Sequence, residues 1–211
     1  MTDVFNSAAK GWHSRLRAAV SPLDSGVGQL EIRGYRPAGQ QFYRPRKTAA
    51  VLVPLLDLDE PEIVLTRRSD HLPQHAGQVS FPGGAAEKDD LSAVHTALRE
   101  AFEEIGLPAE LTTPLGFLDR LDTISDYRVL PVVALVQPPV IWTPDQREVA
   151  EVFTIPVTFI MNLAHYENRP VERAGTEYSI WYLQYERHTI WGATAAILLN
   201  LAMRFRDAGN A

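Results

Sequence analysis

The chain has 211 residues, a formal net charge of −6 and no cysteine. This length suffices for one domain with a full hydrophobic core. The acidic balance argues against a nucleic-acid-binding or membrane-surface protein, and the lack of cysteine excludes disulfides and thiol catalysis. The N-terminus lacks the uninterrupted apolar core of a signal peptide, and no apolar run is long enough to span a bilayer, so we expect a cytoplasmic protein.

Residues 1–46 are predicted to form an appendage, a helix followed by a loop, packed on a main domain of residues 47–211. Residues 3–19 place their apolar side chains near one face of a helix. The segment that follows is rich in Gly, Pro and Gln and carries two Tyr-Arg-Pro copies, at 35–37 and 43–45. These copies indicate loops around a short extended piece.

The main domain is predicted to contain a mixed β-sheet with helices on both faces, an α/β fold. Residues 49–56 are almost entirely apolar, which is typical of a central strand buried on both faces, and they form a hairpin with residues 62–67. Pro82-Gly83-Gly84 predicts a turn. Further strands are expected at 78–81, 115–121, 129–136, 151–155 and 178–185, and helices at 156–163 and 192–206.

A predicted helix that ends near residue 107 crowds three carboxylates. Its apolar residues recur at a spacing of three and four: Leu91, Val94, Leu98, Ala101 and Ile105. The carboxylates fall on the opposite side: Glu100, Glu103 and Glu104. Gly106 is the predicted C-cap.

These glutamates occupy an unfavourable place on the helix. Glu100 and Glu104 are an i,i+4 like-charge pair, and all three lie at the negative C-terminal end. A solvated helix face is the simple alternative, since Glu is a good helix former. Crowded carboxylates otherwise favour a hard divalent cation, and Mg²⁺ often also binds substrate phosphates. The residues therefore predict a Mg²⁺ or Mn²⁺ site for phosphate chemistry.

Residues 99–107, Arg-Glu-Ala-Phe-Glu-Glu-Ile-Gly-Leu, resemble the second half of the Nudix box, G-x5-E-x7-R-E-U-x-E-E-x-G-U, in which U is a bulky apolar residue. Ala101 is small for its U position. In the first half, the box Gly would fall at Ala85 and the box Glu at Leu91. Which nearby acid takes the role of that Glu is left open among Glu87, Asp89 and Asp90.

The segment before the box resembles the signature of bacterial coenzyme A pyrophosphatases, through residues 65–69, His75 and residues 77–84. The resemblance covers roughly residues 47–207. It implies the Nudix α/β/α sandwich and a metal-dependent hydrolysis of coenzyme A, or of a derivative, to 3′,5′-ADP and 4′-phosphopantetheine or its acyl form. The implied cofactor is Mg²⁺ or Mn²⁺, and the partner is the small-molecule substrate.

The resemblance also implies roles for individual residues. The metal-ligand positions of the box fall on Glu100, Glu103 and Glu104, and Arg99 matches the arginine that orients them, so these four are the predicted catalytic residues. The predicted substrate-binding residues are Arg68, His75, Gly83 and Gly84. A box glutamate, Glu148 or Glu151 could act as general base.

Other residues carry weaker predictions. Arg128 is a further phosphate-binding candidate, whereas Trp191 and Tyr182 are assigned to the core in preference to an adenine-stacking platform. Two other functions stay open: a Nudix hydrolase for another nucleoside diphosphate, such as ADP-ribose or a dinucleotide, and a non-catalytic Nudix-fold ligand sensor. No nucleic-acid or membrane partner is expected, and the oligomeric state, with a homodimer as one option, is left open.

Overall fold

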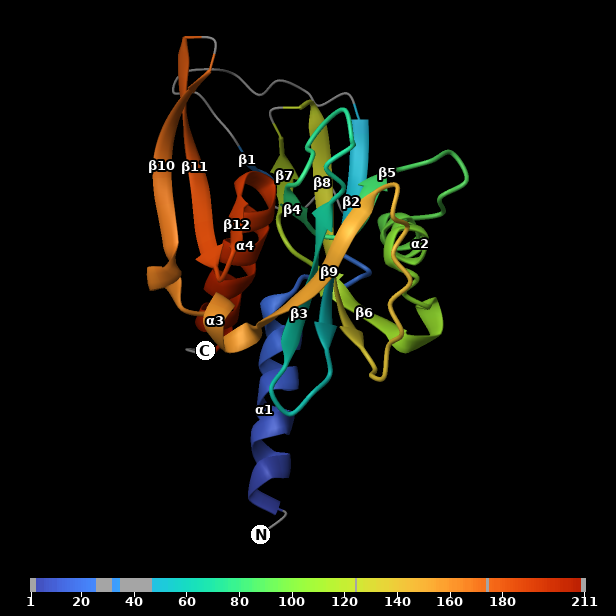
Figure 1. The fold of residues 1–211 in the computed structure, drawn as a ribbon. Coiled ribbons are helices and arrows are strands. Elements are labelled where there is room, and N and C mark those ends of the chain that lie inside the picture. Colours follow the sequence, from blue (N-terminus) through green and yellow to red (C-terminus); the bar gives the residue numbers. More distant parts are fainter. Residues whose placement is uncertain (1–2, 26–31, 35–46, 124, 174, 210–211) are drawn as a thin grey trace.

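A mixed β-sheet forms the centre of the protein (Figure 1). The structure, a computed structural model, describes residues 3–25, 32–34, 47–123, 125–173 and 175–209. The sheet comprises β1 (Ile32–Gly34), β2 (Lys47–Leu56), β3 (Glu62–Arg68), β4 (Val79–Ser80), β5 (Gly83–Ala85), β6 (Thr112–Phe117), β7 (Arg120–Asp122), β8 (Tyr127–Val136) and β9 (Val149–Pro156). The main path runs β1-β7-β8-β2-β3-β4, and β5, β6 and β9 pair with β2, β8 and β3 respectively.

Strand β2 is central, as its apolar sequence predicted. It lies parallel to β8 and antiparallel to β3, with which it forms the predicted hairpin. Successive side chains of a strand point to opposite faces of the sheet. Leu52 accordingly belongs to one hydrophobic cluster, whereas Val53 and Leu55 belong to the other.

Helices cover both faces of the sheet, which gives the predicted α/β/α sandwich (Figure 1). On one face lies α2 (Ala93–Ile105), which packs Ala97, Ala101 and Ile105 into the cluster that contains Leu52. The other face carries three helices: α1 (Asp3–Ala19), the short α3 (Val157–Ile160) and α4 (Gly192–Ala208). The predicted helices at 3–19, 156–163 and 192–206 are therefore all present.

A second, three-stranded antiparallel sheet was not predicted. It consists of β10 (Tyr166–Arg173), β11 (Thr176–Tyr185) and β12 (His188–Trp191). Only β11 was expected, as residues 178–185. Strand β10 is polar and contains Pro170, which lacks a backbone donor and so argues against a strand. Pairing with β11 along eight residues stabilises β10 as an edge strand, where a proline is tolerated.

Two other predictions, one of a turn and one of a strand, were wrong in detail. The segment 82–84 was expected to be a turn, but Gly83–Ala85 forms β5 and pairs with β2. The strand expected at 115–121 divides into β6 and β7, because Asp119 is buried and bonds to α4 instead of continuing the ladder. Its Oδ1 accepts a 2.7 Å hydrogen bond from Arg204 Nη1.

Helix α2 begins later than the spacing predicted, but it packs the predicted face on the core through Val94, Leu98, Ala101 and Ile105. Ser92 is its N-cap and accepts a 3.2 Å hydrogen bond from the His95 backbone N–H. Leu91 therefore lies before the helix and is 91% exposed, while Glu104 is only 5% exposed. Leu91 is the one residue of the predicted stripe outside the helix, because helical periodicity starts only after the cap residue Ser92. The C-cap prediction was correct, because Gly106 closes the helix with a φ of 68°.

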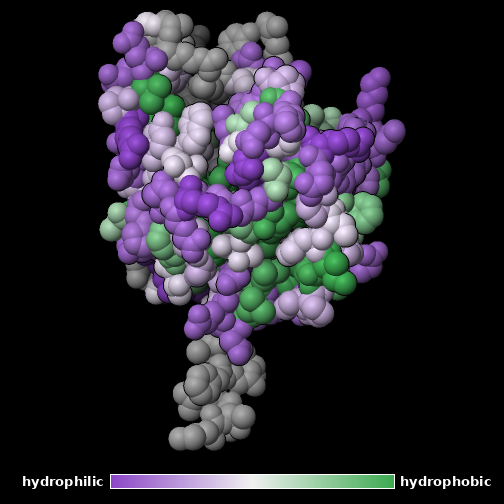
Figure 2. Space-filling view, viewed as in Figure 1, coloured by the Kyte–Doolittle hydropathy of each residue, from purple (hydrophilic) through white to green (hydrophobic). Residues whose placement is uncertain are grey.

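The N-terminal segment is described in part. Leu16 of α1 is fully buried against the main core, and the Ser21 backbone bridges to Phe117. The two Tyr-Arg-Pro copies lie outside the described residues, and the division at residue 46 stays a prediction. In the parts of the chain that the structure describes, no helix combines the length and the apolar character needed to cross a bilayer. Figure 2 shows hydrophilic residues over most of the β10–β11 hairpin and apolar residues gathered nearer the middle of this face.

Candidate active site

Glu104 is a buried carboxylate at the meeting point of α2, β5 and the end of β3. Its Oε2 accepts a 3.1 Å hydrogen bond from the Gly83 N–H, and its Oε1 lies 3.8 Å from Arg68 Nη1. Burial raises the pKa of Glu104 from 4.5 to about 8, because desolvation disfavours the charged form. The Gly83 N–H and Arg68 partly oppose this rise, whereas the nearby Glu100 and Glu148 carboxylates add to it.

Glu100 lies beside Glu104 and is 17% exposed at its side chain. Burial raises the pKa of Glu100, and the ion pair with Arg99, 3.0 Å from Nη1 to Oε1, partly offsets this effect. The carboxylate lies directly against Gly84, where an added Cβ would stand 2.5 Å from it. Gly84 thus leaves room for the Glu100 carboxylate in its present position, because a side chain at residue 84 would displace it.

Gly83 is constrained differently. Its φ is +154°, and a Cβ there would lie 2.5 Å from the Ala50 carbonyl oxygen of the neighbouring strand. Both glycines were predicted to bind substrate. In the structure Gly83 donates to Glu104 and Gly84 borders Glu100, so both support the glutamates directly.

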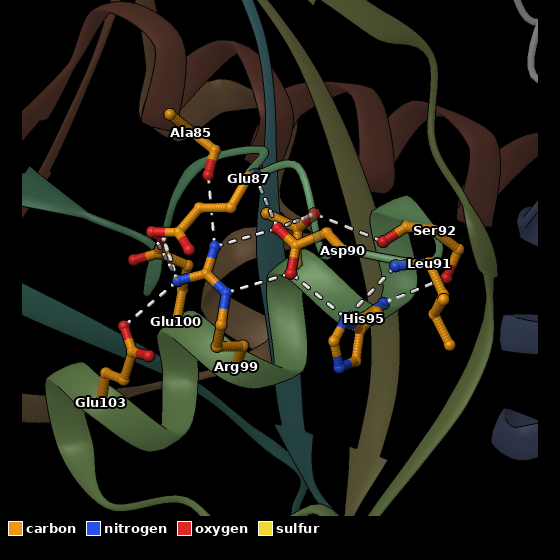
Figure 3. Close-up of polar contacts among 10 residues, drawn as sticks. Ala85, Glu87, Asp90, Leu91, Ser92, His95, Arg99, Glu100 and Glu103 are labelled. Carbon is orange, nitrogen blue, oxygen red and sulfur yellow. Dashed lines mark hydrogen bonds and ion pairs between the residues drawn. The ribbon is translucent and has the colours of Figure 1, made fainter.

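Arg99 connects the glutamates to the loop before α2 (Figure 3). Its Nε and Nη2 each donate a 3.0 Å hydrogen bond to the two carboxylate oxygens of Asp90. Its Nη1 bonds Glu103 Oε2 at 3.1 Å and faces Glu100, while Nη2 also reaches the Ala85 carbonyl at 3.3 Å. The arginine therefore contacts two of the three glutamates, Glu100 and Glu103, whereas the resemblance implied that it orients all three; its catalytic role stays a prediction.

Of the three acids that the sequence left open, Asp90 makes the hydrogen bonds to Arg99, while Glu87 lies 3.9 Å from Arg99 Nη1. The Asp90 side chain is 3% exposed and also accepts bonds from Thr96 Oγ1 and the Glu87 N–H, both at 2.9 Å. The hydrogen bonds from Arg99 hold the pKa of Asp90 well below its usual range. The sequence offered one signal that favours Asp90: it directly precedes Leu91, the position at which the box Glu was expected.

The three remaining acidic candidates differ in their exposure and in the residues that they contact. The side chain of Glu103 is 56% exposed and is turned toward Arg99. Glu148 lies close enough to Glu100 and Glu104 to raise the pKa of both, and its carbonyl accepts a 2.8 Å bond from the Ser69 N–H beside Arg68. Glu151 instead binds Arg187 and lies 3.6 Å from His188 Nε2.

The donor set of this site suits a hard divalent cation. Glu100 and Glu104 are oxygen donors that repel each other when ionised, and a bound cation would relieve that repulsion. Within the described ranges, no group of three acidic or histidine side chains is placed to hold a metal ion. Mg²⁺ rarely needs one, since it keeps several waters and binds through one or two carboxylates together with substrate phosphates. The residues present therefore fit such an ion.

Arg68 joins this acidic cluster to a cavity of about 260 Å³. The cavity is lined by His75, Gln78, Ser80 and residues of β11, β12 and the start of α4. His75 is exposed, and its Nδ1 lies 3.0 Å from Gln78 Oε1. Arg68 Nε is buried and has no hydrogen-bond partner among the described residues. Two predicted substrate-binding residues, Arg68 and His75, thus share one cavity.

Three weaker assignments can be placed in the structure, and one of them, Trp191, changes. Trp191 was predicted to lie in the core but is 36% exposed and lines this cavity, because β12 ends there and α4 begins at Gly192. Tyr182 is half-buried. Arg128, a weaker phosphate candidate, makes hydrogen bonds of 2.7 and 2.9 Å to the two oxygens of Asp122.

Together, the fold and the site define an α/β/α domain whose acidic helix adjoins an arginine-bordered cavity. The chain matches the NUDIX domain family over residues 46–174. It is 36% identical over 182 residues to the uncharacterized Nudix hydrolase NudL of Enterobacter sp. (strain 638), covering 86% of this chain and 94% of that protein. It is 42% identical over 163 residues to the protein of the same name from Yersinia pestis (strain Pestoides F), covering 77% and 82%.

A solved structure supports the same fold. The MutT protein from Methanosarcina mazei Go1 superimposes with a TM-score of 0.51 at 17% identity, covering 81% of this chain and all of that one. The chain therefore belongs to the Nudix family. It is a Nudix pyrophosphohydrolase for a nucleoside diphosphate derivative.

Proposed function

We propose that this protein hydrolyses the pyrophosphate bond of coenzyme A or of a coenzyme A derivative, releasing 3′,5′-ADP and 4′-phosphopantetheine or its acyl form. The observation that carries the proposal is the position of Arg68. This residue belongs to the segment that resembles the coenzyme A pyrophosphatase signature, and it faces both Glu104 and the cavity. A guanidinium in that place suits a phosphate, which it binds through charge-assisted hydrogen bonds.

A divalent ion, Mg²⁺ or Mn²⁺, would be held by Glu100 and Glu104 together with substrate oxygens, and Glu103 is the third predicted ligand. When bound, it supplies charge neutralisation at the pyrophosphate and lowers the pKa of a coordinated water. Arg99 keeps Glu100 and Glu103 in place through its bonds to both. Arg68 binds and orients the phosphate that faces the cavity.

The reaction itself needs a water and a proton acceptor. The water oxygen bonds to one phosphorus as the bridging P–O bond breaks in line, and the freed bridging oxygen stays with the departing phosphate. Glu148 is the acid that we assign to receive the water proton, because its carboxylate lies close enough to Glu100 and Glu104 to raise the pKa of both. Glu151 is less suited, since Arg187 and His188 already occupy it.

A product assay tests the substrate. The purified protein with Mg²⁺ or Mn²⁺ is offered coenzyme A, ADP-ribose, NADH and diadenosine polyphosphates, and the products are separated by chromatography. Release of 3′,5′-ADP from coenzyme A in preference to turnover of the others is expected. Preference for another compound would overturn the coenzyme A assignment, and binding without turnover of any compound would favour a ligand sensor.

A further inference from the structure

Trp191 presents an aromatic surface to the cavity that adjoins the acidic helix. It is one of the few large apolar side chains in the described residues that are exposed, at 36%. Ile180 and Val79 line the same cavity, so much of its wall is apolar. An exposed indole in a concave, largely apolar site is a feature of ligand pockets, whereas a core tryptophan would be covered by neighbouring layers.

The indole has an aromatic neighbour on the adjacent strand. Tyr182 lies directly opposite Trp191 in the β11–β12 pairing, and the two rings stack with centroids 6.2 Å apart and planes 12° from parallel. The Arg169 guanidinium in turn lies 4.6 Å from the centroid of the Tyr182 ring. A ring supported in this way loses little conformational freedom when a ligand stacks on it, which favours binding.

We propose that this cavity binds the base of the substrate nucleotide, stacked on Trp191. The assignment rests on the proposed function as a hydrolase of a nucleoside diphosphate derivative, and it holds for any such substrate. At about 260 Å³ the cavity is smaller than the sites of about 300–1,000 Å³ that enclose whole drug-sized ligands, so it takes one part of the substrate. Trp191 is then a binding residue that contributes to specificity.

Two physical arguments favour the base over the pantetheine arm. A base has flat π-faces and a polar edge, which match an indole wall with polar groups such as the Gln78 amide at its rim. The pantetheine arm is a flexible chain without a π-face, so it gains little from stacking. Only one sugar separates a base from its first phosphate, so the base site must adjoin the phosphate site, and Arg68 borders both.

The test compares two ligands that both carry a phosphate, AMP and 4′-phosphopantetheine, by calorimetry on the full chain with Mg²⁺. Trp191→Ala is expected to weaken AMP binding about tenfold, equivalent to about 1.4 kcal/mol, while 4′-phosphopantetheine binding changes less than about twofold. Trp191→Phe keeps an aromatic face and should stay within about threefold of wild type for AMP. Trp142→Phe, on a half-buried residue packed against the opposite core cluster, is the matched control.

Fluorescence gives a second readout that does not depend on the alanine variant folding. AMP should quench tryptophan emission in the wild type and in Trp142→Phe but not in Trp191→Phe. Equal AMP affinity in wild type and Trp191→Ala, or quenching that survives in Trp191→Phe, would overturn the assignment, as would a loss confined to 4′-phosphopantetheine. Turnover of ADP-ribose in place of coenzyme A, with the AMP results intact, would overturn the proposed substrate and still support the base site.

Discussion

Asp90 accepts two parallel hydrogen bonds from Arg99, each 3.0 Å long. This pair connects the loop before α2 to the glutamates at the end of that helix. Such a bidentate pair fixes the plane of the guanidinium as well as its position. The free edge of that guanidinium then faces Glu100 and Glu103. Asp90 therefore acts on the site through Arg99, as a positioning residue.

Asp90→Asn should lower kcat about 10- to 100-fold and weaken Mg²⁺ binding, because supporting partners of metal-binding side chains usually have effects of that size. Asp90→Glu should recover part of the loss, since it restores a carboxylate near Arg99. Asp89→Asn is the control, because Asp89 is exposed and next in sequence. Activity assays and Mg²⁺ calorimetry provide the measurements. Equal losses in the Asp89 and Asp90 variants would contradict the positioning role.

The raised pKa of Glu104, about 8 against 4.5 when unfolded, predicts how the stability of the metal-free protein depends on pH. Between these two values the folded state holds a proton that the unfolded state has lost, so the free energy of unfolding falls as the pH rises. A total fall on the order of a few kcal/mol is expected. Glu104→Gln should flatten the curve, and Glu103→Gln, at an exposed position, should leave it unchanged.

Urea denaturation in the presence of EDTA, across pH about 5 to 8, measures that curve. Added Mg²⁺ should stabilise the protein most at the upper end of the range, since metal ligands must be deprotonated. A stability that rises with pH in EDTA, or one that Glu104→Gln leaves equally steep, would show that burial does not hold a proton on this carboxylate.

Glu103→Gln and Glu104→Gln should each reduce turnover by at least about a hundredfold, or about 2.7 kcal/mol in activation free energy, while the fold survives. Glutamine keeps the size of the side chain but loses the charge that a cation needs. Glu110→Gln is the matched control, because Glu110 is exposed in the short helical turn Ala109–Leu111 after α2. Circular dichroism checks the fold, and wild-type turnover in either site variant would overturn the metal-site interpretation.

Adjacent glycines should respond differently to the same substitution. In Gly83→Ala the new Cβ meets the Ala50 backbone and the φ of +154° disfavours a side chain, so the protein should lose more than about 1 kcal/mol of stability. In Gly84→Ala the Cβ meets only the flexible end of Glu100. That variant should keep most of its stability but lose at least about tenfold in kcat, since it displaces a carboxylate of the site. Urea denaturation together with kinetics separates the two, and a reversed pattern would refute this explanation.

The sequence was sufficient for the local features of the fold. Hydrophobic patterning identified β2 as central, and the carboxylate crowding near Gly106 identified the helix that carries the site, because both signals arise from residues close in sequence. The resemblance at residues 99–107 then gave the family. Strand β10 escaped prediction because a polar strand with an internal proline forms only when a partner strand pairs with it.

By itself, the sequence determined the class of chemistry: a helix with three crowded glutamates, an arginine before them and a glycine cap after them. Tertiary structure alone decided how these groups differ, burying Glu104, exposing Glu103 and choosing Asp90 as the partner of Arg99. It also opened the Trp191 surface beside Arg68. Burial and pairing depend on which segments meet in space, and β3, β5, β12 and α4 come together from across the chain.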